Sequence, residues 1–285
     1  MGNEVGKRKK RRREDENEPA AATRESTAGP KRENAEPAAA TNAFTTNPVL
    51  IGQYEVVLDS KGRCAVIHPL VEDVTALPNY KSMVTLAELV LKNKDTLNAG
   101  GANSTAEIAN ANWKKNKWVD LKRSGKWQLD VLSVKLRGEI KAAIKAVVDD
   151  VVRPAHDAYR ADSRSTAKKQ LPPSIGFRIF VNDMHGQVPG EDDTPSAAYH
   201  KDDGTCWSAS VRLPLSPAED ATGGGEMAVS VIDRPADIES IEDDVMEVLP
   251  ALRPGGVSFI PAHVAHEIRA VRGGRRVTLV VFWAR

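Results

Sequence analysis

Four short motifs between Tyr199 and Trp283 decide the fold of this chain. They read Tyr199-His200-Lys201-Asp202, Gly224-Gly225-Glu226, Pro261-Ala262-His263-Val264-Ala265-His266-Glu267-Ile268 and Gly274-Arg275-Arg276. The segments around them are short and are separated by turn residues, and every second side chain from Trp207 to Leu215 is apolar. About eight such runs over roughly 110 residues predict the strands of a β-sandwich or jelly roll.

Two histidines and one aspartate in this stretch form a candidate metal site. His200 and Asp202 are two residues apart, and on a β-strand residues i and i+2 point to the same face. His266 would come from another strand. Two neutral imidazoles and a carboxylate are the facial ligand set of non-haem Fe(II) sites, which leaves coordination positions open. Further candidates for groups around the metal are Tyr199, Arg212 and His263, and His263 is equally well read as a turn residue.

The cations that follow His266 predict a carboxylate partner. Arg272-Gly273-Gly274-Arg275 is a turn signal. A two-residue loop puts Arg275 on the face of His266, whereas a three-residue loop puts Arg276 there, and spacing alone leaves both registers open. A guanidinium beside a metal needs an anion to offset its burial, and its fork suits a carboxylate. The expected anion is a dicarboxylate co-substrate.

The four motifs together resemble the catalytic core of the 2-oxoglutarate/Fe(II)-dependent dioxygenases, prolyl-4-hydroxylase type. That family carries His-x-Asp, then Gly-Gly-Glu, then a histidine followed by Val-x-x-Gly-x-Arg, and a closing tryptophan. In this chain the pattern falls on His200 and Asp202, on 224–226, on His266, on 271–276 and on Trp283. The family's Gly-x-Arg spacing favours Arg276 over Arg275.

The resemblance implies a fold, a chemistry and a set of ligands. The fold is mainly β with flanking helices (α+β), in which a double-stranded β-helix, a cupin-like jelly roll, follows a helical region. The ligands are Fe(II) at His200, Asp202 and His266 and 2-oxoglutarate at Arg276, with O2 as co-substrate and ascorbate as a reductant that often maintains ferrous iron. No catalytic side chain is expected beyond the metal centre. The implied reaction hydroxylates a substrate, such as a prolyl or other side chain of a protein, or a small molecule.

A second similarity competes with this interpretation. Gly255 to His266 also fits the second metal motif of cupins, which share the barrel. The first cupin motif requires His-x-His and a nearby glutamate, whereas this chain has Asp202 and then no glutamate before Glu219. A nucleic-acid demethylase of the same superfamily would want a second arginine where Phe282 stands. The alternative function is a cupin-like or catalytically silent metal-binding protein that its basic tail tethers to nucleic acid.

Residues 1–48 predict a disordered tail, because Ala, Pro, Thr, Glu and Asn dominate it. Seven consecutive cations run from Lys7 to Arg13. Such a run is accessible to a nuclear import receptor or to a polyanion, or is simply solvated. It predicts a nuclear or cytoplasmic location and leaves nucleic acid open as a partner. Acylation of Gly2, and so a membrane anchor, is disfavoured because Gly6 stands where the motif requires Ser or Thr.

Residues 49–170 predict a helix-rich support region, and residues 171–285 predict the dioxygenase jelly-roll domain. Within the first, β-rich runs at 54–58 and 64–68 predict a hairpin, and apolar residues at three- and four-residue spacing predict a helix over 129–152 that ends or kinks at Pro154. The net charge is +1, and the two cysteines form no Cys-x-x-Cys pair. This composition argues against a disulfide scaffold and a structural zinc site, and no apolar run is long enough to span a membrane.

Overall fold

The computed structural model describes residues 47–97, 117–187, 195–202, 206–232 and 245–284. Its helices are a 3-10 turn (Val74–Ala76), α1 (Tyr80–Leu97), α2 (Val134–Val147), a π-helical turn (Val148–Val152) and α3 (Arg153–Ala161). Its strands are β1 (Val49–Ile51), β2 (Tyr54–Leu58), β3 (Ala65–Pro69), β4 (Lys117–Arg123), β5 (Lys126–Trp127), β6 (Arg178–His185), β7 (Ala197–His200), β8 (Cys206–Leu213), β9 (Gly223–Gly224), β10 (Met227–Ser230), β11 (Met246–Leu249), β12 (Val257–Pro261), β13 (His266–Ile268), β14 (Val271–Arg272) and β15 (Arg275–Ala284). The predictions for Gly2 and for the basic run lie outside the described residues.

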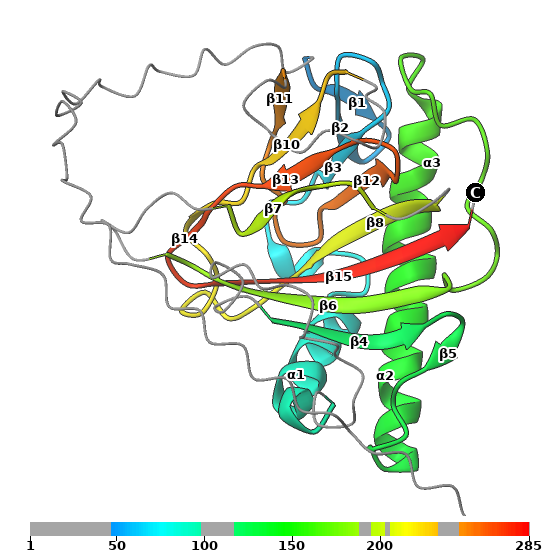
Figure 1. The fold of residues 1–285 in the computed structure, drawn as a ribbon, viewed down its shortest axis with the longest axis vertical. Helices are drawn as coiled ribbons and strands as arrows, with labels where there is room; N and C mark the ends of the chain where they lie inside the picture. The colour runs from blue at the N-terminus through cyan, green and yellow to red at the C-terminus, as the bar shows by residue number, and fades with distance from the viewer. Residues whose placement is uncertain (1–46, 98–116, 188–194, 203–205, 233–244, 285) are drawn as a thin grey trace, which may run out of the picture. The chain divides into compact units, whose positions relative to one another are not determined.

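From β6 onward the chain passes back and forth between two sheets (Figure 1). A nine-stranded sheet contains the order β12-β8-β15-β6, and a four-stranded sheet has the order β11-β10-β13-β7. The sheets face each other, because Val66 and Ile260 of the first share one apolar cluster with Val229 and Leu249 of the second. This alternation is the strand order of a double-stranded β-helix. The predicted fold class, mainly β with flanking helices, is therefore confirmed.

Side chains of β8 and β15 alternate between two destinations. Val211 and Leu279 point to the core beneath the helices. The residues between them point into the space between the two sheets, which we call the interior. Ser208 lies opposite Ile260 across β8 and β12, and Ile260 belongs to the apolar cluster of the interior. Arg212 and Arg276 share this parity, so both begin on the interior face.

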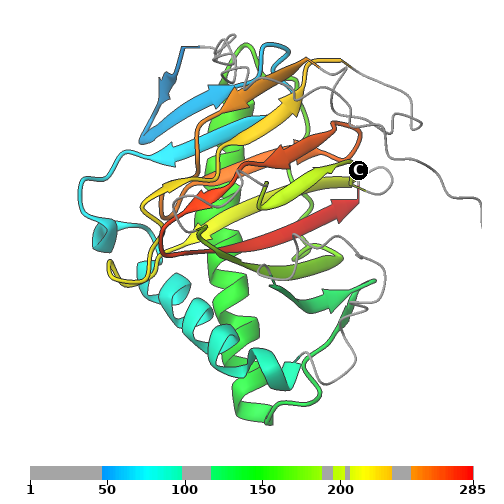
Figure 2. The ribbon, with the colours of Figure 1, turned by 60° about the vertical axis from the view of Figure 1, so that its left-hand side comes forward.

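The helices cover the other face of the nine-stranded sheet (Figures 1 and 2). Ser133 caps α2 by accepting a hydrogen bond from the backbone of Leu136, so this helix begins later than predicted. It also runs on past Pro154, because a wider π-helical turn ends two residues before the proline and α3 follows without a break. Among the described residues, no helix combines the length and apolar character that crossing a lipid bilayer requires.

The predicted hairpin at 54–68 is confirmed, since β2 and β3 pair antiparallel. The chain turns at Gly273 and Gly274, but the strands on either side of the turn do not pair as a hairpin. The prediction that a two- or three-residue loop joins two paired strands here is therefore wrong. β14 pairs with β9 instead, and β15 crosses to the other sheet, where it lies between β6 and β8. The strands β1 to β5 of the predicted support region also join the nine-stranded sheet. The boundary at residue 170 stays a prediction.

Candidate metal centre

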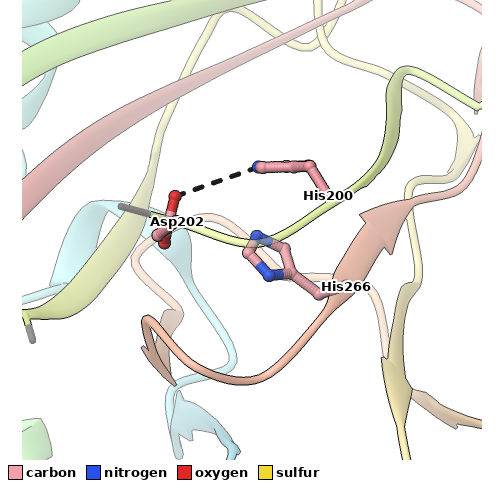
Figure 3. Close-up of side chains that lie close together, drawn as sticks. All are labelled: His200, Asp202 and His266. Atoms are coloured by element: carbon pink, nitrogen blue, oxygen red, sulfur yellow. Dashed lines mark ion pairs between the residues drawn. The ribbon is translucent and has the colours of Figure 1, made fainter. Parts of the chain in front are cut away.

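The three predicted metal ligands meet at one end of the interior (Figure 3). His200 ends β7 and His266 begins β13, and the two residues lie opposite each other across these strands, with ring centroids 4.4 Å apart. Asp202 lies two residues beyond the end of β7, so the expected strand parity does not place it. Its Oδ1 is nevertheless 3.9 Å from His200 Nε2, and ligand atoms of all three residues lie within 4.8 Å of one another.

Neighbouring groups orient these ligands. Ser208 Oγ lies 3.2 Å from Asp202 Oδ2 and donates to it, and His266 Nδ1 lies 3.1 Å from the carbonyl oxygen of Val264. A carbonyl only accepts, so His266 Nδ1 carries the proton and Nε2 keeps a free lone pair. Burial, with His200 adding to it, lowers the pKa of His266 to about 4. The donor set of neutral imidazoles and a carboxylate fits Fe(II).

Arg276 enters the interior from β15 and is only 3% exposed. Its Nη1 donates to the carbonyl oxygen of Gly225, and its Nε has no hydrogen-bond partner among the described residues. Burial, followed by the nearby charge of Arg212, lowers its pKa to about 10. The guanidinium therefore remains a cation at neutral pH, and no described carboxylate forms an ion pair with it. A buried cation in this state fits an anionic ligand.

Arg275 points to the opposite face of the same strand. Its Nε and Nη2 lie 2.5 and 2.6 Å from the two carboxylate oxygens of Asp183, and Lys94 of α1 is 3.7 Å from the same carboxylate. Asp183 pairs with Val277 across β6 and β15, which is on the helix side. Of the two arginines that the sequence left open, the structure turns Arg276 toward the interior.

The three other candidates lie in different surroundings. Arg212 lies beside Arg276, is 9% exposed, and contacts Asp220 and the carbonyl oxygen of Leu252, each at 2.7 Å. His263 is exposed in the turn between β12 and β13 and is not one of the clustered ligands. Tyr199 precedes His200 on β7, so its side chain starts from the other face of that strand.

A cation–aromatic wall that the sequence analysis missed stands beside the metal centre. We define it as Arg178, Phe180 and Phe282. The guanidinium of Arg178 lies 5.1 Å from the ring of Phe180 and 5.7 Å from that of Phe282, and Phe282 lies opposite Ser208. The sequence does show Phe180 alternating with the apolar residues of β6, so it places the two sets on opposite faces of that strand. It does not show which of the two faces would point to the interior.

No family model and no curated protein matches this sequence. Solved structures similar to it include an oxidoreductase of the 2OG-Fe(II) oxygenase family from Burkholderia pseudomallei, which is 15% identical and covers 69% of this chain and 88% of its own, with a TM-score of 0.37. A prolyl-4-hydroxylase from Pseudomonas putida is 13% identical over 72% and 87% of the two chains, with a TM-score of 0.33. A prolyl hydroxylase from Trichoplax adhaerens, in complex with a hypoxia inducible factor peptide fragment, is 11% identical over 79% and 84%, with a TM-score of 0.38.

Proposed function

We propose that this chain is an Fe(II)- and 2-oxoglutarate-dependent oxygenase. His200, Asp202 and His266 would hold the iron, and Arg276 would bind the distal carboxylate of 2-oxoglutarate. The observation that carries the proposal is the pairing of two features within one interior. A two-histidine, one-carboxylate cluster lies at one end, and a buried guanidinium with an unpaired Nε lies on the strand that passes beside it.

The charges of the interior favour a dicarboxylate over a neutral ligand. Arg212 and Arg276 are both buried, and only Arg212 has an ion pair, to Asp220. Asp220 and Glu226 act on Arg276 through their charge, but no described carboxylate is in ion-pair contact with its guanidinium, so a bound carboxylate would be its direct partner. The fork of Arg276 suits bidentate binding of a carboxylate. Its Nη1 is already directed to Gly225, so the guanidinium is held in place before the ligand arrives.

Bound ferrous iron and 2-oxoglutarate supply the oxidising chemistry that activates O2 and hydroxylates a substrate C–H bond. The protein's own contribution is position and exclusion of water. The hydrogen bond from Ser208 restricts rotation of the Asp202 carboxylate, and the carbonyl group of Val264 sets the tautomer of His266. Arg276 orients the co-substrate from the other end. Phe180 and Phe282 make the interior apolar beside Ser208, the residue that contacts Asp202.

The substrate class that we propose is a protein side chain, proline included. Its support is the cation–aromatic wall, because an apolar ring can pack on Phe180 and Phe282 while Arg178 meets a backbone carbonyl or a carboxylate.

The basic run from Lys7 to Arg13 supports a second proposal, a nuclear address. A fluorescent fusion of the full chain should then leave the nucleus when these seven residues are changed to glutamine, and an unchanged distribution would reject that address.

Two adjacent arginines provide a matched test of the co-substrate site. Arg276→Gln should raise the 2-oxoglutarate dissociation constant about 100-fold, because a charge-assisted bidentate contact is lost. Arg275→Gln removes the same charge one residue away, but from the helix side, and should leave that constant within about threefold. The measurement is an anaerobic titration of the Fe(II)-loaded full chain, followed by visible charge-transfer absorption.

Turnover separates the oxygenase from the alternative of a silent metal-binding protein. His200→Ala should abolish succinate formation from 2-oxoglutarate, whereas His185→Ala, a change at an exposed histidine of β6, should not. Metal binding without any 2-oxoglutarate binding in the unaltered chain would reject the oxygenase and favour the alternative. Equal effects of Arg275→Gln and Arg276→Gln would reject Arg276 as the carboxylate ligand.

A further inference from the structure

A cavity of about 280 Å³ lies outside the interior, on the helix-covered side of the nine-stranded sheet. Trp207 and Trp283 line it, and these residues pair across β8 and β15. Both pack with the core beneath the helices. The next residue after Trp207 is Ser208, which points into the interior and contacts Asp202. The cavity and the metal centre therefore lie on opposite faces of the same strands.

His156 of α3 brings a polar ring to this cavity. The residue is 3% exposed, and its ring makes edge contacts with Phe259 and Tyr159, with centroids 5.1 and 6.0 Å away. It forms no hydrogen bond with the described residues. Burial, with the charge of Arg160 adding to it, lowers the pKa of His156 to about 4. The neutral ring offers one donor and one acceptor to a ligand in the cavity.

The remaining lining gives the cavity a charge and a shape. Lys168 and Lys169 line it, and no described carboxylate does. Lys168 is held in place because its Nζ donates to the carbonyl oxygen of Ser165 at 2.7 Å. Trp283 Nε1 donates to the carbonyl oxygen of Ser174 at 2.9 Å, and Trp283 is only 1% exposed, so the half-buried Trp207 offers most of the indole surface. The volume lies just below the range of pockets for drug-sized ligands, which suits a one-ring molecule.

We propose that this cavity binds a one-ring aromatic carboxylate that carries a hydroxyl group. The ring packs on Trp207, with Trp283 beneath it, the carboxylate meets the ammonium groups of Lys168 and Lys169, and the hydroxyl hydrogen-bonds to His156. This is a second ligand site, separate from the pocket of Arg276 and independent of the oxygenase proposal, because Trp207 and Trp283 face the helix-covered side of their strands.

Calorimetric titration of the full chain with 4-hydroxybenzoate tests the site. We expect saturable binding to one site, with a parallel change in indole fluorescence. The amide of the same shape, 4-hydroxybenzamide, should bind at least about tenfold more weakly, since it lacks the charge that the lysines meet. Benzoate, which lacks the hydroxyl, should also bind more weakly than 4-hydroxybenzoate. The absence of saturable heat, or equal affinities for the acid and the amide, overturns the proposal.

Two variants assign the contacts. His156→Phe keeps a planar ring but removes both nitrogens, and it should weaken 4-hydroxybenzoate about tenfold while leaving benzoate unchanged. Lys169→Gln, on the exposed rim, should reduce the ratio of the affinities for 4-hydroxybenzoate and 4-hydroxybenzamide. Lys135→Gln is the matched control, because Lys135 is an exposed lysine of α2 that does not line the cavity. Binding that Arg276→Gln abolishes and Lys169→Gln leaves intact would place the probe in the interior and reject the site.

Discussion

At the scale of single residues, the position of Arg276 depends on the glycine that it contacts. Gly225 has a φ of +76°, and a Cβ built on it would lie 2.1 Å from Arg276 Nη1. Gly225→Ala should therefore displace the guanidinium and lower 2-oxoglutarate affinity by at least about tenfold, with little effect on metal affinity. Gly223→Ala is the matched control, since no atom lies within 4 Å of its added Cβ. Anaerobic titrations of both variants give the comparison, and equal losses would contradict it.

Ser208 positions Asp202, one of the three proposed metal ligands. Its hydroxyl donates to Asp202 and also lies 3.2 Å from the carbonyl oxygen of Ile260. Ser208→Ala should lower affinity for Fe(II), or for Co(II) as a spectroscopic substitute, about 10- to 100-fold, which is the usual effect of losing such a partner. Ser208→Thr should restore most of it. Ser210→Ala, two residues along the same face of β8, should change little, and an equal loss there would remove the special role of Ser208.

Residue identity predicted which three side chains cluster better than it predicted how the strands place them. His200 and His266 do face each other across two strands, as expected for ligands on different strands. Asp202, however, lies beyond β7, where strand parity has no meaning. Ser208 and Val264 could not be named in advance, because their contacts depend on which strands become neighbours and not on spacing along the chain.

At the scale of elements, the hairpin predicted around Gly273 and Gly274 was wrong for the same reason: spacing along the chain does not say which strands become neighbours. Gly273 and Gly274 signal a turn, and the turn exists, with both residues at positive φ. A turn signal does not say whether the next strand returns to the same sheet, and β15 crosses to the other one. Helix ends were set by features of one or a few residues, such as the Ser133 cap. Alternation along β8 needed no such knowledge and was predicted correctly.

Asp183 ties three elements together on the helix side, since it belongs to β6 and contacts Arg275 of β15 and Lys94 of α1. Burial raises its pKa, but the hydrogen bonds and charge of Arg275 outweigh burial and hold the pKa below its usual range. Asp183→Asn should lower the free energy of unfolding by about 3 kcal/mol, because it leaves a largely buried cation unpaired. Urea unfolding measures this change.

The control for that change is a surface pair. Asp157→Asn removes the partner of Arg160 in an exposed pair on α3, with Asp157 63% exposed, and should cost no more than about 0.5 kcal/mol. Metal and 2-oxoglutarate affinities should stay unchanged in both variants, because Asp183 faces away from the interior. A loss of metal binding in the folded Asp183→Asn protein would contradict the separation of the two faces.

At the scale of the whole molecule, the central strands serve two surfaces at once. On β8 and β15 the interior face carries Ser208, Arg212 and Arg276, whereas the helix face carries Val211 and other apolar residues. The apolar core lies on the helix face, and the interior face carries buried polar groups. A titratable side chain that is buried in its neutral form should make the free energy of unfolding depend on pH.

His68 of β3 is the clearest case, because it is 2% exposed and its Nδ1 lies 2.8 Å from Arg253 Nη2. Burial, followed by the charge of Arg253, lowers its pKa to about 3. The folded pKa lies below the unfolded value of about 6.5. The stabilisation is therefore complete above pH 6.5 and is lost as the pH falls toward 3, at about 1.4 kcal/mol per pH unit. Between pH 6.5 and 5.0 this histidine should account for a loss of about 2 kcal/mol. His68→Gln, which cannot titrate, should lose that much less stability than the unaltered chain when urea unfolding is compared at the two pH values. An equal loss in both proteins would show that His68 takes up no proton on unfolding in this range.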